Sequence, residues 1–187
     1  MSKPKLHVIL GSIREGRSGD KVAAWFMKAV ARNTNAEITL VDLRDFNLPL
    51  FADAIVPGDR EGLHPNPMVQ KWLDTVATAD AYVIITPEYN HSFSSALKNA
   101  IDYGAKEWEG KPVAFVSYGG LAGGSRAVEQ LRLVVGDFDM YDIRAQILIP
   151  TVKTAFDTEG NLINGERHTK NANNIIDRLA MLAIKLK

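Results

Sequence analysis

Short apolar runs alternate along this chain with stretches in which apolar residues recur every three or four positions. The runs predict buried strands at 6–10, 38–41, 82–85, 113–116 and 147–149. Helical spacing predicts helices around 22–30, 67–77, 94–103 and 127–135, and a further helix in the tail at 175–186. Two long loops, 44–65 and 151–167, interrupt this alternation, and loops of this length often form lids or contact surfaces.

Strands that alternate with helices form parallel sheets with helices on both faces. Right-handed crossovers then produce a doubly wound α/β fold, a three-layer α/β/α sandwich around a five-stranded parallel sheet. Five strands fit the flavodoxin-like order 2-1-3-4-5, which we assign by analogy because periodicity does not determine strand order. With no linker or repeat, we expect residues 1–187 to form a single flavodoxin-like domain.

Composition narrows the possible functions. Basic and acidic residues number 22 each, so the formal net charge is zero, which argues against nucleic-acid partners and against charge-driven membrane attachment. No run approaches the ~20 apolar residues of a membrane span, and no signal-peptide pattern opens the chain, so we expect a cytoplasmic protein without membrane partners.

Cysteine and histidine usage restricts the chemistry further. The chain has no cysteine, which excludes disulfides, thiolate catalysis and iron–sulfur clusters, so redox chemistry would need a bound cofactor. The four histidines show no metal-ligand spacing, and no metal site is predicted. The segment 157–161 looks like part of a calcium loop, but its ligand spacing is incomplete and we expect a β-turn.

The turn after the first strand has the composition of a phosphate-binding loop. Residues 11–19 read GSIREGRSG and lead into a helix, whose N-terminus offers free N–H groups and a favourable dipole. The glycines allow a tight turn, Ser12 and Ser18 offer hydroxyls, and Arg14 and Arg17 offer charged donors. We predict a phosphate site here; a solvated loop with N-capping serines is the alternative.

The same turn nearly matches the P-loop of nucleoside-triphosphatases. Gly11, Gly16 and Ser18 fit the pattern G-x-x-x-x-G-K-[ST], but Arg17 stands where the lysine belongs. Asp42, at the end of the second strand, would be the candidate magnesium ligand. Arginine is not a neutral replacement for that lysine, and the other turns have no role in this interpretation, so a P-loop nucleotide-binding protein is a minor alternative.

The turn after the third strand carries groups suited to a flat ligand. Pro87 fixes the backbone, while Glu88, Tyr89 and Asn90 offer backbone amides, an aromatic face and an amide side chain for a ribityl chain or heterocycle. The alternative is that Tyr89 packs on the loop and Asn90 caps the next helix. His91 is either a proton donor or a solvated loop residue.

The turn after the fourth strand is rich in glycine. Residues 117–125 read SYGGLAGGS, and glycines after a buried strand indicate close approach of the backbone to a neighbour. Backbone N–H groups aimed at a ring carbonyl would tune a flavin, whereas a flexible connector is the alternative. Because the carboxyl ends of parallel strands share one edge, the three turns predict one site for a phosphate-bearing, flat cofactor.

These motifs resemble the NADPH-dependent FMN reductase family, whose members include flavin, quinone, azo-dye and chromate reductases. The resemblance spans roughly residues 5–135 and depends on GSIR at 11–14, PEYN at 87–90 with LKNAID at 97–102, and SYGG at 117–120. It implies that FMN is bound, with the phosphate held by Ser12 and Arg14 and with help from Arg17 or Ser18, and from Gly19. It also implies that the ribityl chain and ring contact Pro87, Glu88, Tyr89, Asn90, Ser117, Tyr118, Gly119 and Gly120.

The implied activity is hydride transfer from NADPH or NADH to FMN, followed by electron transfer to a small-molecule acceptor such as a flavin, quinone or azo compound. No catalytic side chain is expected, because the flavin N5 carries the hydride. A flavodoxin-like electron carrier is the main alternative, although such carriers tend to be strongly acidic and this chain is neutral. The resemblance also implies a homodimer or homotetramer, with the apolar segment 48–51 and Trp108 as candidate contact residues; both are otherwise core or rim residues.

Overall fold

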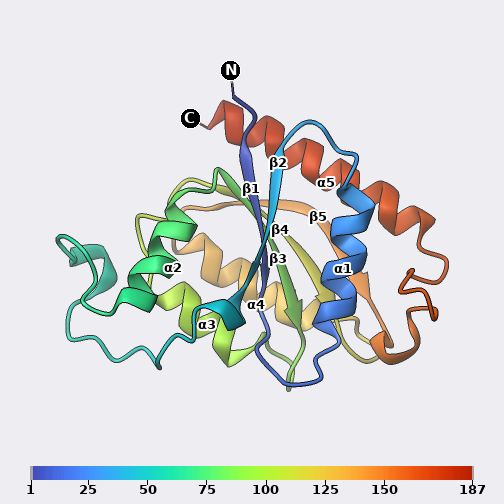
Figure 1. Cartoon of the computed structure of the whole chain (residues 1–187), viewed down its shortest axis with the longest axis horizontal. Helices are drawn as coiled ribbons and strands as arrows, with labels where there is room; N and C mark the ends of the chain where they lie inside the picture. The colour runs from blue at the N-terminus through green and yellow to red at the C-terminus, as the bar shows by residue number, and fades with distance from the viewer. Residues whose placement is uncertain (1, 187) are drawn as a thin grey trace.

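The computed structural model, which describes residues 2–186, has a five-stranded parallel sheet between two layers of helices (Figure 1). The strand order is β2-β1-β3-β4-β5, and all four neighbouring pairs are parallel, so the predicted topology is confirmed. Residues 1 and 187 of the predicted domain lie outside the described residues. The strands are β1 Lys5–Leu10, β2 Glu37–Asp42, β3 Ala81–Pro87, β4 Pro112–Tyr118 and β5 Tyr141–Ile149.

Five α-helices in the described part of the chain connect and cover the strands. They are α1 Gly19–Val30, α2 Pro67–Ala77, α3 Ser95–Asp102, α4 Ser125–Gly136 and α5 Glu166–Lys185. Most elements begin within three residues of the predicted position, but β5 and α5 begin six and nine residues before it. The first turns of α5 are polar and carry no apolar stripe, and β5 is an edge strand whose first half mixes polar with apolar residues.

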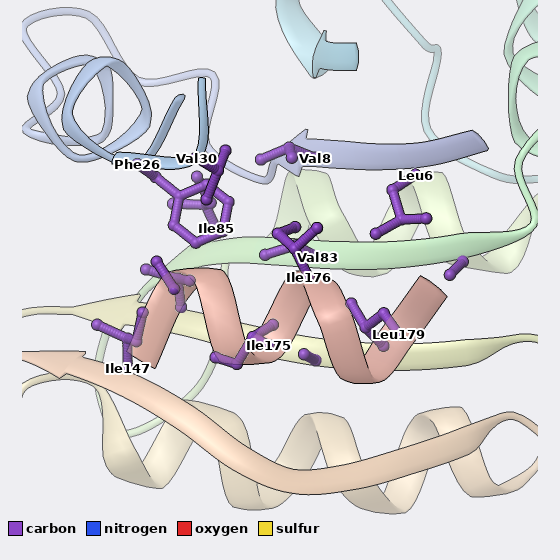
Figure 2. Packing of buried hydrophobic residues seen from close by; sticks show 14 of the residues in the cluster. Leu6, Val8, Phe26, Val30, Val83, Ile85, Ile147, Ile175, Ile176 and Leu179 are labelled. Atoms are coloured by element: carbon purple, nitrogen blue, oxygen red, sulfur yellow. The ribbon is translucent and has the colours of Figure 1, made fainter. Parts of the chain in front are cut away.

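Two hydrophobic clusters lie on the two faces of the sheet. On one face, α1 and α5 contribute Phe26 and Ile176 to a cluster that also contains Val83 and Ile85 of β3; in Figure 2, Phe26 lies beside Ile85 and Ile176 beside Val83. On the other face, α2, α3 and α4 enclose a cluster that contains Trp72 and Trp108. Every residue of β3 and β4 is buried, so the centre of the sheet is covered on both faces.

Trp108 belongs to this core and is not available for a subunit contact. Its exposed fraction is 1%, its ring lies 4.9 Å from that of Tyr82, and its Nε1 donates to the carbonyl of Ile101 at 3.2 Å. The apolar segment 48–51 is divided: Phe51 packs on Tyr103 with ring centroids 5.2 Å apart, whereas Leu50 is 83% exposed.

Three neighbouring strands bring the predicted turns to one edge of the sheet. Leu10 of β1 pairs with Ile85 of β3, and Pro87 of β3 pairs with Tyr118 of β4. The winding of the chain reverses between β1 and β3, which makes this the topological switch point where α/β sheets bind ligands. Figure 1 shows the blue turn after β1 beside the green carboxyl end of β3.

The loop after β5 contains the expected β-turn. The amide of Gly160 donates to the carbonyl of Asp157 at 3.2 Å, and the Asp157 side chain accepts from the amides of Glu159 and Asn161. The carboxylate that suggested a calcium ligand therefore closes the turn itself. No helix among residues 2–186 is both long and apolar enough to span a membrane.

Candidate functional site

Arg17 holds the turn after β1 in shape. Its side chain is only 2% exposed, and its guanidinium bonds Asp20 at the start of α1, both oxygens of Asp42 at the end of β2, and the carbonyl of Ser12. Burial alone would lower the pKa of Arg17, but the two carboxylates raise it above its ordinary value. The predicted contact of Arg17 with phosphate therefore does not fit this geometry, because its donors already have internal partners.

The same ion pair argues against the P-loop interpretation. Asp42 would have to hold magnesium, but it accepts from the Arg17 guanidinium and from the amide of Arg44. Burial tends to raise the pKa of Asp42, and these bonds outweigh that effect and lower it. The residue at the lysine position and the acidic strand end neutralise each other.

Three groups of donors in this turn remain available to a ligand. Arg14 is exposed, and its side chain has no hydrogen bond or ion pair within residues 2–186. Ser18 is half-buried and does not cap α1 with its side chain, so the capping alternative for Ser18 is wrong. Without that cap, the amides of Gly19 and Asp20 have no hydrogen-bond partner within residues 2–186, and they lie at the positive end of the helix dipole, whereas the Lys21 amide donates to the carbonyl of Ser18. Together these groups suit a phosphate.

Two tyrosines connect the turn after β1 to the other two turns. Tyr89, from the turn after β3, lies with its hydroxyl 2.9 Å from the Ser12 hydroxyl. Tyr118, at the end of β4, reaches under the start of α1, where its hydroxyl would lie 2.5 Å from a Cβ at Gly19. Gly19 is therefore required for this close approach. Tyr89 therefore contacts the first turn through its hydroxyl, whereas the alternative given above was that it packs on its own loop.

The Tyr118 hydroxyl is a buried polar atom without a hydrogen-bond partner of good geometry among the described residues. Burial raises the pKa of Tyr118 above its ordinary value, the nearby Tyr89 adds to the rise, and Ser12 offsets part of it. Buried hydroxyls without partners are uncommon in native proteins. An oxygen acceptor bound at this turn would satisfy Tyr118.

The turn after β3 is a tight hairpin. Asn90 and His91 have φ values of 50° and 69°, and two backbone hydrogen bonds of 2.8 and 3.0 Å join Tyr89 to Ser92. Two consecutive residues with positive φ define a type I′ turn. Asn90 therefore forms the turn and is not a helix cap; Ser94 caps α3 instead and also donates to the carbonyl of Gly11.

Glu88 is held by the next helix. Its side chain is 6% exposed and accepts from the guanidinium and the backbone amide of Arg126, in the first turn of α4. Burial tends to raise the pKa of Glu88, but the bonds and charge of Arg126 lower it. The carboxylate therefore fixes the backbone of the turn. The amides of Glu88 and Tyr89 already donate to the carbonyls of Tyr118 and Ser92, so the exposed side chain of Asn90 is the polar group of this turn that remains for a ligand.

The glycines after β4 have two different roles. Gly124 has a φ of 86°, and a Cβ there would lie 2.6 Å from the Ser117 Cβ, so it is required by the packing of the chain. Gly120 has no atom within 4 Å of an added Cβ, and Gly119 meets only ordinary contacts. At Gly124 the predicted close approach is therefore to Ser117 of the same chain. Gly119 and Gly120 leave room that a flat ligand could fill. Ser117 is buried and donates to the carbonyl of Gly123.

Sequence reasoning missed the partners that hold these turns. Asp42, Ser94 and Arg126 each fix one of them, but they follow no motif and lie far along the chain from the groups they bind, whereas Asp20 lies three residues after its partner Arg17. Only Asp42 had been singled out, and for a different role. The signal that could have indicated an internal carboxylate is the presence of two arginines, Arg14 and Arg17, in one short turn.

Known proteins are similar to this chain in sequence and in fold. Residues 4–154 match the family model for NADPH-dependent FMN reductase. An NAD(P)H-dependent FMN reductase of Schizosaccharomyces pombe is 37% identical over 137 residues, covering 73% of this chain and 68% of that protein. A quinone reductase of Pseudomonas putida is 33% identical over 139 residues, covering 71% and 70%. The flavoenzyme FerB of Paracoccus denitrificans, 23% identical, shares the fold with a TM-score of 0.75, covering 97% of this chain and 98% of FerB.

Proposed function

Since the chain belongs to the NADPH-dependent FMN reductase family and is an NAD(P)H-dependent FMN oxidoreductase, we propose that a quinone is its electron acceptor and that the three turns hold FMN. The quinone is the acceptor named for similar proteins of comparable length, among them the Pseudomonas putida enzyme. One observation carries the assignment of the site. The free donors of the first turn, the buried Tyr118 hydroxyl and the open face of Gly120 lie at the same switch point of the sheet.

The phosphate would be bound by the turn after β1. Arg14 supplies charge, Ser18 and Ser12 supply hydroxyls, and the start of α1 at Gly19 supplies N–H groups. Arg17 supports this turn through Asp42 and does not touch the phosphate. The sequence left open whether Arg17 or Ser18 contacts the phosphate, and the geometry favours Ser18.

The ribityl chain and the ring would lie across the other two turns. The backbone of Pro87, Glu88, Tyr89 and Asn90 would line one side, and Ser117, Tyr118, Gly119 and Gly120 would flank the ring. When bound, FMN supplies the redox chemistry by accepting a hydride from NAD(P)H and passing the electrons to the acceptor. The chain's residues bind, orient and exclude water, and none is assigned as an acid or base in this step.

A spectroscopic experiment tests the proposal. The purified protein is incubated with FMN, desalted, and its visible spectrum recorded before and after anaerobic NADPH or NADH, and then after 1,4-benzoquinone. We expect a retained flavin band that bleaches with NAD(P)H and returns with the quinone. A retained band that neither nucleotide bleaches would indicate an electron carrier. A band that bleaches but does not return after addition of the quinone would contradict the proposal that a quinone is the acceptor.

The assembly and the location are also proposals. A groove of about 530 Å³ beside the first turn is lined partly by Ile13, Leu48 and the exposed Leu50. Exposed apolar surface of this kind suits a protein contact, and we propose that it belongs to a homodimer or homotetramer. Sedimentation of wild type and of Leu50→Glu tests this, with dissociation expected for the variant. A cytoplasmic location and a single domain over 1–187 remain predictions.

A further inference from the structure

His91 occupies a position where a side chain is conformationally costly. It is the second central residue of the type I′ turn, with a φ of 69°, where glycine is the usual residue. Asn90 in the first position tolerates left-handed backbone better than most residues do. Strained non-glycine residues that persist in a well-ordered turn concentrate at functional sites. A role for the exposed imidazole would explain why this position does not carry glycine.

Helix α4 holds this turn rigidly. Gln130 donates to the carbonyl of His91 at 2.9 Å and accepts from the Ser92 hydroxyl at 2.6 Å. Arg126 donates from Nη1 to Nε2 of His91 at 2.8 Å, and Arg126 is itself anchored by the buried carboxylate of Glu88. The imidazole thus has a fixed backbone and a fixed ring partner, although it lies at the surface.

The partner determines which ring nitrogen carries the hydrogen. A guanidinium has only donors, so Nε2 of His91 accepts and the ring hydrogen lies on Nδ1. Within residues 2–186 no group hydrogen-bonds Nδ1. The charged groups that the structure places against the ring are Arg126 and, behind it, Glu88. The result is an Nδ1–H donor, held in one tautomer and directed away from Arg126.

We propose that the Nδ1–H of His91 donates a hydrogen bond to a carbonyl oxygen of the quinone acceptor, with Arg126 as the residue that positions it. The inference depends on the proposed function, because it places the acceptor at the turn after β3. NAD(P)H, a proton and the quinone yield NAD(P)⁺ and the quinol: the hydride carries both electrons and one proton, and solvent supplies the second proton. His91 transfers no proton in this step, and its hydrogen bond stabilises the negative charge that develops on the oxygen.

The first test separates the two half-reactions. His91→Gly removes the donor and relieves the backbone, so it is expected to fold, and its flavin should be reduced by NADPH at the wild-type rate. Reoxidation by 1,4-benzoquinone should slow about tenfold, as for one lost neutral hydrogen bond, while reoxidation by ferricyanide, which has no carbonyl oxygen, should not change. His91→Asn keeps an N–H at the Nδ1 position and tolerates positive φ, so it should restore most of the quinone rate.

The second test needs no cofactor. In ¹⁵N NMR of the histidine rings, wild-type His91 should show the Nδ1–H tautomer, and Arg126→Gln should shift it toward Nε2–H, while Arg126→Lys should preserve the wild-type pattern. An Nε2–H tautomer in the wild type, or equal quinone rates in wild type and His91→Gly, would overturn the inference. If NADPH fails to reduce the wild-type flavin, the proposed function is wrong instead, so the two failures are distinguishable.

Discussion

The turns after β1 and β3 are built in the same way but with opposite charges. In the first, a buried cation, Arg17, is satisfied by two carboxylates, and a second cation, Arg14, remains free at the surface. In the second, a buried anion, Glu88, is satisfied by Arg126, and the imidazole of His91 remains at the surface. In both turns one ionised group shapes the backbone while its neighbour is left for a ligand.

This comparison shows why residue type alone does not identify a binding residue. Arg14 and Arg17 lie three positions apart in one phosphate-like motif, yet only one of them is available. The difference arises from Asp42, on a strand that is distant in sequence and adjacent in the sheet. A buried charge requires a partner, so the arginine nearer the core takes the carboxylate.

The largest expected effect comes from removing the buried cation. Arg17→Met leaves Asp42 and Asp20 without their shared partner, and we expect the free energy of unfolding to fall by about 3 kcal/mol or more. FMN retention should fall as well, because the Ser12 carbonyl loses its donor. Urea denaturation measures the first effect, with the exposed Arg32→Met as the matched control. A loss no greater than that of the control would contradict a structural role for Arg17.

The two kinds of glycine after β4 should separate stability from binding. Gly124→Ala places a Cβ against Ser117 at a left-handed residue and should cost about 2 kcal/mol of stability. Gly120→Ala fills empty space, so unfolding should change by less than about 0.5 kcal/mol, while FMN affinity should fall. Unfolding curves and FMN titrations of both variants test this. Normal FMN binding by Gly120→Ala would show that the space beside Gly120 is not part of the FMN site.

Arg14→Ala is the counterpart of the Arg17 substitution. Loss of a charged phosphate contact should weaken FMN binding by about 1–3 kcal/mol, with the unfolding of the FMN-free protein unchanged. Fluorescence titration with FMN gives the dissociation constant, and titration with riboflavin, which has no phosphate, is the control. An unchanged constant for FMN would contradict the phosphate assignment.

The smallest effect concerns acid stability. The pKa of Asp42 and that of Glu88 are lowered in the folded protein from ordinary values of 3.8 and 4.5. Each carboxylate therefore contributes stability above its ordinary pKa, and the contribution is lost as pH falls through the folded pKa. Asp42→Asn and Glu88→Gln should each reduce the slope of unfolding free energy against pH below about pH 4.5. Slopes equal to that of the wild type would show that the ion pairs do not persist in solution.

Much of this protein could be predicted from the chain itself. Strand-and-helix alternation determined the α/β class and four of the five strand positions closely, because buried parallel strands require continuous apolar runs. The composition of the turns predicts a site at 11–19, 87–90 and 117–120, because glycines, hydroxyls and a helix start form such a turn within a few neighbouring residues. The early part of β5 and the start of α5 lacked such patterns, and both were predicted too short.

Only the tertiary structure decided which of those residues are free. Asp42 binds Arg17 because β2 lies beside β1, Arg126 binds Glu88 because α4 begins next to the turn after β3, and Tyr118 reaches Gly19 across the sheet. Each pairing joins segments that are far apart in sequence, and no local pattern encodes the distance between them. Sequence alone therefore determined the fold class and predicted the turns that would form the site. The packing of strands and helices determined which groups of those turns have internal partners, because a buried ionised group requires a partner within the protein.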